Sequence, residues 1–350
     1  MLCLYLTVSD IMKSRIVVVN TDSKEFSYGG VSPIMRNMHP YLMENFDVDY
    51  LFLPDSWKKA PGIIRFKMMI YLLFEWNRLK NCDFILSHIP EGSFIASFTG
   101  IPYCHIYHGN NNPMTVSRYW FGKYFKFVFD MFYKRIERTC PLKYTVGPVL
   151  GDKKKLFNPI NHNVYVKPYE ERHGFIFAGR LELVKNVDHL IRIYAKVPLE
   201  MRKKDHFYIA GFGTQEETLK ALVSKLEMTE YIHFLGNLSN AQLVEEDSTK
   251  KILMMASRQE GLPTAIAEAL SVGVPVVSTN VGDVSTVLKD NYNGFIFPLD
   301  FRDEDYIKAI ILILSDYDRF SRNALESSKV FNAKEITENM VSEIHKVLNK

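Results

Sequence analysis

The sequence predicts an α/β protein made of two domains, each built on a parallel β-sheet. Short apolar runs rich in β-branched and aromatic residues alternate with longer helical stretches from Arg15 to about Pro298. The alternation occurs twice, with a polar, proline-containing connection between the two series. The length of 350 residues suits two domains of ordinary size. Two such sheets would leave a deep cleft between the domains, with ligands beyond the carboxyl ends of the strands.

The predicted strands follow from short apolar runs that turn residues interrupt. Each half supplies five of them, and the connection lies at 151–174. The predicted strands are 16–19, 48–52, 84–87, 103–107 and 143–146 in the first half, and 174–178, 207–210, 232–234, 252–255 and 274–278 in the second.

The composition is typical of a globular protein of the cytoplasm. Hydrophobic residues make up 47% of the chain, charged residues 24%, and the formal net charge is +3, which argues against a disordered or polyanion-wrapping chain. Cys3, Cys82, Cys104 and Cys140 lack CxxC spacing, so they predict neither a zinc site nor a disulfide framework. No apolar run reaches the roughly 20 residues of a membrane-spanning helix. The opening residues lack the basic region of a secretory signal, and Met12 is the stronger start.

Two glutamates eight positions apart mark the most informative segment. Glu260 precedes a Gly-Leu-Pro turn, and Glu268 lies in the helix that this turn opens. Pro263 suits the first position of that helix, where no N–H is needed. Such a helix start attracts anions, and a carboxylate can accept hydrogen bonds from two neighbouring sugar hydroxyls. The residues alone leave a solvated helix surface as an equal alternative.

Two cations follow the first strand of the second half. Arg180 and Lys185 lie around the predicted start of an amphipathic helix. A guanidinium and an ammonium beside a helix N-terminus can hold a diphosphate through charge-assisted hydrogen bonds and the helix dipole. A solvated basic turn is the alternative, since cations near a helix start are common.

Paired glycines in the first half give a weaker signal. Gly29 and Gly30 let a backbone approach a phosphate closely, although a Gly-Gly pair is often only a turn. The GxGxxG fingerprint of nicotinamide enzymes is absent, and the GFGT segment at 211–214 is too short to suggest it.

Histidines end two predicted strands. His108 follows the strand 103–107 and precedes a glycine, so it can offer a hydrogen bond to a substrate hydroxyl. Strand alternation places His108 on the face of Cys104 and of residue 106, and His105 on the other face. His105 is expected in the core, whereas His88 either lines the ligand site or packs.

Several ordered motifs in the second half together resemble one family. FIFAGRLELVKNVDHLIRIYAKV, YIAGFGTQEETLKALVSKLEMTEYIHFLGNLSNAQL and ASRQEGLPTAIAEALSVGVPVVSTNVGDV are similar to successive segments of the retaining glycosyltransferases of the GT-B fold, family 4, also called glycosyl transferases group 1. The family signature E-x7-E is matched by Glu260 and Glu268. The first half resembles the family only in Gly29, Gly30, CDFILSH and the His-Gly pair at His108.

The resemblance implies a role for each matching residue. Arg180 and Lys185 would hold the donor diphosphate, and Glu268 the ribose hydroxyls. Glu260 would contact the donor sugar. Backbone N–H groups around Gly261, Leu262 and Pro263 would face the sugar and phosphate, Gly29 and Gly30 would close over the phosphates, and His108 would lie near the reacting end of the sugar.

The resemblance also implies an architecture and a reaction. The expected domains are 1–165 together with a returning helix 333–350, and 166–332. The expected reaction transfers a sugar from a UDP or GDP sugar to a glycan or lipid-linked glycan with retention and without a metal or other cofactor, in synthesis of a bacterial surface polysaccharide. A nucleotide-sugar epimerase, and a catalytically silent subunit that binds another glycosyltransferase, are the alternatives.

Two segments of the first half could touch a membrane. In 118–138 nine aromatic residues are interleaved with basic residues that outnumber the acidic ones, and 65–80 is similar. Both could lie on an anionic bilayer and place the enzyme at its cytoplasmic face. A helix packed on the first sheet with a solvated basic edge is an equal alternative.

Overall fold

The computed structural model describes residues 13–21, 31–58, 63–108, 122–146, 149–161 and 166–350. The chain divides into two compact units, Met1–Pro159 with Lys334–Lys350, and Ile160–Ala333. Each unit contains one six-stranded sheet, and every strand pair is parallel. The predicted α/β fold with two parallel sheets is confirmed.

The first unit has the strand order β2-β1-β3-β4-β5-β6. All five predicted strands are present within one residue of their expected ends, and the added strand at the sheet edge is only two lysines long. The strands are β1 (Arg15–Asn20), β2 (Asp47–Phe52), β3 (Phe84–Ser87), β4 (Tyr103–Tyr107), β5 (Leu142–Thr145) and β6 (Lys154–Lys155). The helices are α1 (Val31–Asn45), α2 (Asp55–Lys58), α3 (Ile64–Phe74), α4 (Trp76–Lys80), α5 (Pro90–Ala96), α6 (Gly122–Thr139) and α14 (Ala333–Leu348).

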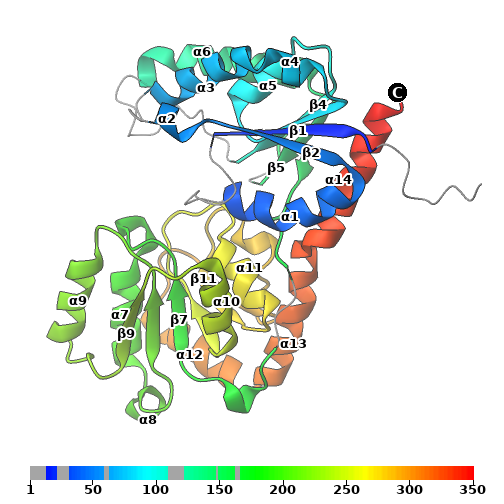
Figure 1. Ribbon diagram of the computed structural model, residues 1–350. Helices are drawn as coiled ribbons and strands as arrows, with labels where there is room; N and C mark the ends of the chain where they lie inside the picture. The colour runs from blue at the N-terminus through cyan, green and yellow to red at the C-terminus, as the bar shows by residue number, and fades with distance from the viewer. Residues whose placement is uncertain (1–12, 22–30, 59–62, 109–121, 147–148, 162–165) are drawn as a thin grey trace, which may run out of the picture. The chain divides into compact units, whose positions relative to one another are not determined.

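Helices cover both faces of this sheet (Figure 1). On one face α1 and α14 pack against Val18 and Ile106, and α14 contributes Met340 and Ile344 to that core. On the other face α3, α5 and α6 pack against side chains that include Tyr107. The chain thus returns to the first unit through its last helix, as the resemblance implies.

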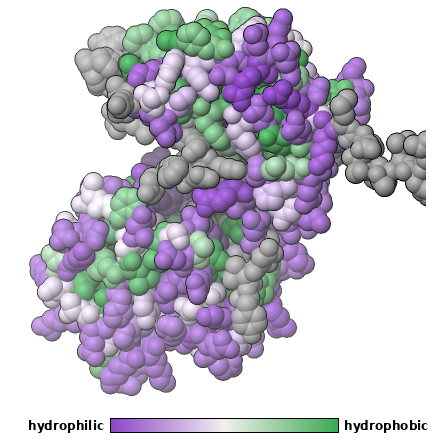
Figure 2. All heavy atoms as spheres, viewed as in Figure 1, coloured by the Kyte–Doolittle hydropathy of each residue, from purple (hydrophilic) through white to green (hydrophobic). Residues whose placement is uncertain are grey.

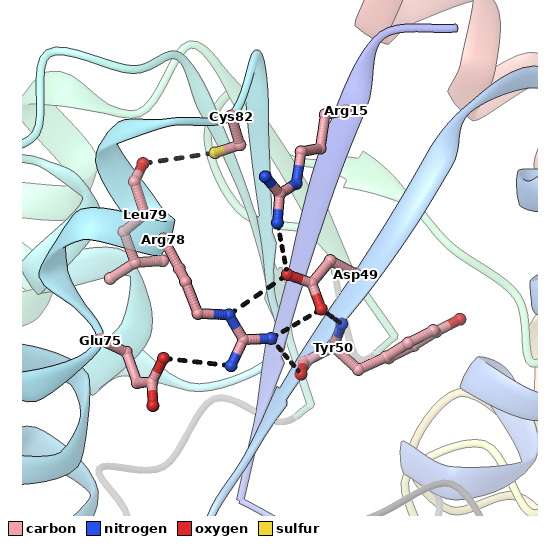
Figure 3. Close-up of polar contacts among 7 residues, drawn as sticks. All are labelled: Arg15, Asp49, Tyr50, Glu75, Arg78, Leu79 and Cys82. Atoms are coloured by element: carbon pink, nitrogen blue, oxygen red, sulfur yellow. Dashed lines mark hydrogen bonds and ion pairs between the residues drawn. The ribbon is translucent and has the colours of Figure 1, made fainter.

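One acidic residue of the edge strand β2 forms ion pairs with neighbouring elements (Figure 3). The Asp49 carboxylate accepts hydrogen bonds from Arg15 at 3.0 Å and from Arg78 at 2.7 and 3.3 Å. Arg78 also binds Glu75 at 3.1 Å, so this guanidinium joins helix α4 to the sheet edge. The short helix is therefore anchored through charge as well as through its buried Leu79.

The second unit has the strand order β12-β11-β10-β7-β8-β9. Its sixth strand, β12, was not predicted. The strands are β7 (Phe175–Ala178), β8 (Phe207–Ala210), β9 (Ile232–Gly236), β10 (Ile252–Met254), β11 (Val276–Thr279) and β12 (Gly294–Phe297). The helices are α7 (Val187–Lys196), α8 (Leu199–Arg202), α9 (Glu216–Lys225), α10 (Asn240–Ser248), α11 (Thr264–Ser271), α12 (Asp303–Ser315) and α13 (Tyr317–Ser328), and short 3-10 turns are η3 (Tyr169–Glu171), η4 (Leu183–Lys185), η5 (Val284–Thr286) and η6 (Lys329–Phe331).

A buried tyrosine links the neighbouring strands β10 and β11. Tyr306 of α12 is fully buried, and its hydroxyl lies 2.8 Å from the carbonyl oxygen of Val277 and 3.1 Å from the amide nitrogen of Met255. The Thr279 hydroxyl donates to the Ser257 carbonyl at 2.6 Å. The loop that carries Glu260 therefore leaves the sheet from a fixed point.

Cys82, Cys104 and Cys140 are buried free thiols, and burial raises the pKa of Cys82 to about 11 and that of Cys140 to about 12.

Candidate functional site

The loop after β7 carries Arg180 and is shaped by backbone contacts. The Gly179 amide donates to the Ala210 carbonyl at 3.0 Å, and the Leu181 amide donates to the Phe212 carbonyl at 2.9 Å. The loop thus runs beside the GFGT segment that follows β8. Arg180 itself is exposed at the carboxyl end of β7.

The glycines of the GFGT segment are required by this close approach. A Cβ added at Gly211 would lie 1.8 Å from the Gly179 carbonyl oxygen, and one added at Gly213 would lie 2.4 Å from the Leu181 carbonyl oxygen. Real Cβ atoms do not approach backbone oxygens so closely. The segment is not part of a nicotinamide fingerprint. It holds the Arg180 loop, a role that only the contact between two loops reveals.

Lys185 and Glu260 are brought together as an ion pair. The Lys185 ammonium lies 2.6 and 2.7 Å from the two carboxylate oxygens of Glu260. The lysine side chain is 16% exposed and the glutamate side chain 8%. Removing either partner of a pair this far from water leaves a charge with little solvation, so the two side chains stabilise each other.

Arg258 holds the two loops of this pair together. Its amide donates to the Val184 carbonyl at 2.8 Å, and its guanidinium donates to the Asn186 side-chain oxygen at 3.0 Å. Asn186 adopts the left-handed conformation (φ 57°) at the start of α7, which turns the chain after Lys185. No sequence pattern marks Arg258, because the side chain that it binds lies in a loop 72 residues away.

The Gly-Leu-Pro turn rests on a second backbone contact. The Asp283 amide donates to the Gly261 carbonyl at 2.9 Å. Leu262 and Pro263 are buried, whereas Gly261 is exposed. Pro263 is the N-cap of α11 and not its first residue, since its ψ of 128° is extended. Within the described residues the N–H groups of Gly261 and Leu262 donate no hydrogen bond.

Glu268 is buried in α11 beside a second acidic residue. Its side chain is fifth in the helix, and burial raises its pKa to about 7. Asp247 of α10 is fully buried, and neither of its carboxylate oxygens has a hydrogen-bond partner among the described residues. Burial and then the charge of Glu268 raise the pKa of Asp247 well above its ordinary range. The solvated-surface alternative for Glu268 is wrong, and Asp247 carried no sequence signal because it sits in a polar helix.

The first unit holds the predicted histidine. His108 follows β4, and its Nε2 lies 3.0 Å from Nδ1 of His88, which follows β3. The predicted alternation along β4 is confirmed, since Cys104 and Ile106 face the α1 and α14 core and Tyr107 the opposite core. His105 is buried with its Nδ1 2.7 Å from the Ser93 hydroxyl, as expected of a core histidine. Gly29 and Gly30 lie outside the described residues.

Among the described residues Arg180 forms no ion pair with Glu260. The Arg180 side chain is exposed, and its charge is felt by Glu182, whose pKa is lowered mainly by hydrogen bonds from Thr214. Within the described residues no group of three or more histidine, cysteine or acidic side chains is placed to hold a metal ion.

Gly282 tests whether backbone contact positions Glu260. A Cβ at Gly282 would lie 2.2 Å from the Glu260 carbonyl oxygen, and the residue has φ +59°. Gly282→Ala should lower the free energy of unfolding by at least about 2 kcal/mol, combining left-handed strain with a clash. The matched control is Gly236→Ala, where φ is +68° and no atom lies within 4 Å of the added Cβ. Urea unfolding should show a larger loss of unfolding free energy for Gly282→Ala. Equal losses in the two variants would exclude a stabilising contact between Gly282 and the Glu260 carbonyl.

The pH dependence of stability tests the burial of Glu268. Its pKa of about 7 in the folded chain exceeds the ordinary 4.5. The folded state therefore binds this proton more tightly, and its contribution is full below pH 4.5 and lost as the pH rises through about 7. Wild-type stability should fall by about 3 kcal/mol relative to Glu268→Gln between pH 5 and 8. Urea unfolding at each pH measures this change in stability. Glu230 is exposed, so the stability of Glu230→Gln should change with pH as that of the wild type does.

Comparison with known sequences matches the second unit to a family. Residues 162–327 match the family described as Glycosyl transferases group 1. An alpha-1,4-N-acetyl-D-galactosaminyltransferase of Campylobacter jejuni, named for an undecaprenol-linked substrate, is 28% identical over 204 residues, or 56% of this chain and 55% of that protein. An uncharacterized glycosyltransferase of Methanocaldococcus jannaschii is 23% identical over 303 residues, 82% of this chain and 83% of that protein. The match to the Campylobacter protein thus spans about half of its length.

Solved structures share the fold of the whole chain. A sucrose-phosphate synthase of Thermosynechococcus elongatus has a TM-score of 0.77 at 13% identity, covering 96% of this chain and all of that one. The Anabaena protein HepE in complex with UDP has a TM-score of 0.72 at 14% identity, covering 95% of this chain. At these identities the likeness establishes the GT-B fold. The match over residues 162–327 makes the second unit similar to the group 1 glycosyltransferases.

Proposed function

We propose that this chain transfers a sugar from a nucleotide-sugar donor to a glycan or lipid-linked glycan acceptor, with retention at the anomeric carbon and without a metal ion. The observation that carries the proposal is the Lys185–Glu260 ion pair beside the start of α11, with Glu268 buried in the same helix. Cations, N–H donors and a carboxylate are thereby presented together on one unit, the combination that a nucleoside diphosphate sugar needs.

The charges suggest how the leaving group is stabilised. During transfer the bond between the anomeric carbon and the diphosphate oxygen breaks, and negative charge grows on the diphosphate. Lys185 and Arg180 offset that charge, a role that a bound cation fills in other enzymes. Because Glu260 already holds the Lys185 ammonium, a donor diphosphate would share this cation while the Glu260 carboxylate turns to sugar hydroxyls. The acceptor hydroxyl then bonds to the anomeric carbon on the face that the diphosphate leaves, and its proton goes to the departing phosphate.

In this scheme Glu268 binds the ribose hydroxyls of the donor. Its ionised carboxylate can accept hydrogen bonds from two vicinal hydroxyls, whereas the protonated form can accept fewer. With a pKa of about 7, the residue is held in the acceptor form more completely as the pH rises. The donor base is proposed to be uracil or guanine. Support for a surface-polysaccharide role comes from relatives such as the O-antigen chain mannosyltransferase B of Escherichia coli, 30% identical over 138 residues.

A panel of UDP and GDP sugars in a thermal-shift assay tests the donor. A donor at a hundred times its dissociation constant should add about 2.7 kcal/mol of stability. Slow release of UDP or GDP without an acceptor is then expected, since water can replace the acceptor hydroxyl. Binding without release of nucleotide, even with acceptor mixtures, would favour a silent subunit, and conversion of the bound sugar to its epimer would favour an epimerase.

Arg180 provides the test of the diphosphate contact. Arg180→Ala should lower turnover by about 100-fold while leaving the melting temperature unchanged, because the side chain is exposed and supports charge only in the transition state. The matched control is Arg192→Ala, which removes another exposed arginine of the same unit. Steady-state kinetics with the identified donor measure both variants. Wild-type turnover in Arg180→Ala would exclude this role.

We also propose that the outer face of the first unit binds an anionic membrane surface. Helix α6 buries Phe129, Phe132 and Ile136, as the packed-helix alternative requires. Its opposite side exposes Phe127 and Met131.

Helix α3 extends this exposed face. It exposes Leu73 and Phe74, and the Phe66 ring contacts Phe125 of α6 at 5.2 Å, so the two helices share one surface. Hydrophobic residues are visible along the edge of this unit where α3 and α6 lie (Figure 2). No described helix is long and apolar enough to cross a bilayer.

Both 65–80 and α6 contribute cations. In 65–80, Arg65 pairs with Glu91 at 2.9 Å and Arg78 pairs with Asp49, whereas Lys80 is exposed. Lys134 and Arg138 are exposed on α6. Aromatic side chains beside such lysines and arginines can enter the headgroup region while the cations attract anionic lipid.

Flotation with vesicles tests this face. The wild-type protein should float with anionic vesicles in low salt and dissociate in high salt, because the attraction is screened. Phe74→Ser with Phe127→Ser should lower binding by about tenfold. Leu312→Ser, at an exposed leucine of α12 in the second unit, is the matched control. No flotation with anionic vesicles, or equal flotation of all variants, would exclude the proposal.

A further inference from the structure

We propose that His88 is a positioning residue for His108, holding the His108 imidazole in one tautomer and one orientation. The inference rests on the proposed function only in giving His108 a place beside the donor sugar. The two rings are stacked with centroids 5.2 Å apart and planes 23° apart, and Nδ1 of His88 lies 3.0 Å from Nε2 of His108.

The sheet brings these two residues together. Strands β3 and β4 are neighbours, with Ser87 in register with His105, so the residues that follow them emerge at one edge. The His88 amide donates to the Val19 carbonyl of β1 at 3.0 Å, and the His88 side chain is buried. His88 is therefore fixed among three neighbouring strands, and His108 directly follows β4.

Both imidazoles are neutral near pH 7. Burial, then the charges of His108 and His105, lowers the pKa of His88 well below its ordinary value, and burial lowers the pKa of His108 to about 4. His105 is the other titratable group that acts on His88, and its Nδ1 is engaged by the Ser93 hydroxyl. A neutral imidazole has one donor nitrogen and one acceptor nitrogen.

One shared hydrogen bond therefore fixes both rings. If Nδ1 of His88 donates, Nε2 of His108 accepts and the proton of His108 is on Nδ1, ready to donate to a ligand hydroxyl. If Nε2 of His108 donates, its Nδ1 is left as an acceptor. In either case Nδ1 of His108 is either a donor or an acceptor, not both. The hydrogen bond made by one ring nitrogen decides whether the other carries the proton.

Two substitutions separate this role from packing. His88→Asn keeps a polar atom where Nδ1 lies, and His88→Leu keeps apolar bulk but cannot hydrogen-bond. The imidazole 15N chemical shifts of His108, in histidine-labelled protein at pH 7.5 without any substrate, report its tautomer.

The wild type and His88→Asn should show one tautomer of His108, and His88→Leu a mixture. A mixture in the wild type, or one unchanged tautomer in His88→Leu, would overturn the proposal. His206→Leu is the matched control, because His206 and His233 form a similar stacked pair at 2.8 Å in the second unit.

Kinetics then connect the tautomer to transfer. With the identified donor, His88→Leu should lower kcat by about tenfold with KM little changed, the loss expected for one hydrogen bond. His88→Asn should recover most of that loss, and His206→Leu should match the wild type. A rise in KM alone, or no recovery with asparagine, would assign His88 to packing. Because the 15N measurement needs no sugar donor, it decides the tautomer even if the chain transfers no sugar.

Discussion

The ion pair between Lys185 and Glu260 is the contact on which the arrangement of the second unit's site depends. Each residue belongs to a loop that leaves the carboxyl end of a different strand, and neither loop alone would direct its side chain to the other. Arg258 joins the loops through the Val184 carbonyl and the Asn186 side chain. With both charges largely out of water, the pair is stable only while these loops stay in register. A donor that engages Lys185 therefore also changes the surroundings of Glu260.

Close backbone contact is the second condition for this site. Gly211 and Gly213 let the loop after β8 touch the loop that carries Arg180, and Gly282 lets the loop after β11 touch the carbonyl of Glu260. In each case the space for a Cβ is occupied by a backbone oxygen. These glycines do not contact the donor in the proposed scheme. They determine how near three loops can approach, and so where the charged side chains lie.

Burial controls the charge of the remaining groups. Glu268 and Asp247 are acids in a low-dielectric setting that favours their protonated forms, and His88 and His108 are bases that the same effect keeps neutral. The two units thus carry side chains of different chemistry. The second presents charge at Lys185, Glu260 and Arg180, whereas the first presents neutral hydrogen-bonding groups whose direction is set by their neighbours.

The sequence by itself determined the two parallel sheets, because their buried strands are short apolar runs. The residue pattern alone located both ends of β3, β4 and β8. It missed β6, which is two lysines, and β12, because a short edge strand lacks a distinct run. The segments that resemble the glycosyltransferase family also marked Lys185, Glu260 and Glu268. Only the tertiary structure decided that Lys185 pairs with Glu260, that Asp247 lies beside Glu268, and that His88 bonds His108. Those contacts join residues 20 to 75 positions apart. Sheet register and loop packing decide which of these side chains meet, and local sequence does not encode either of them.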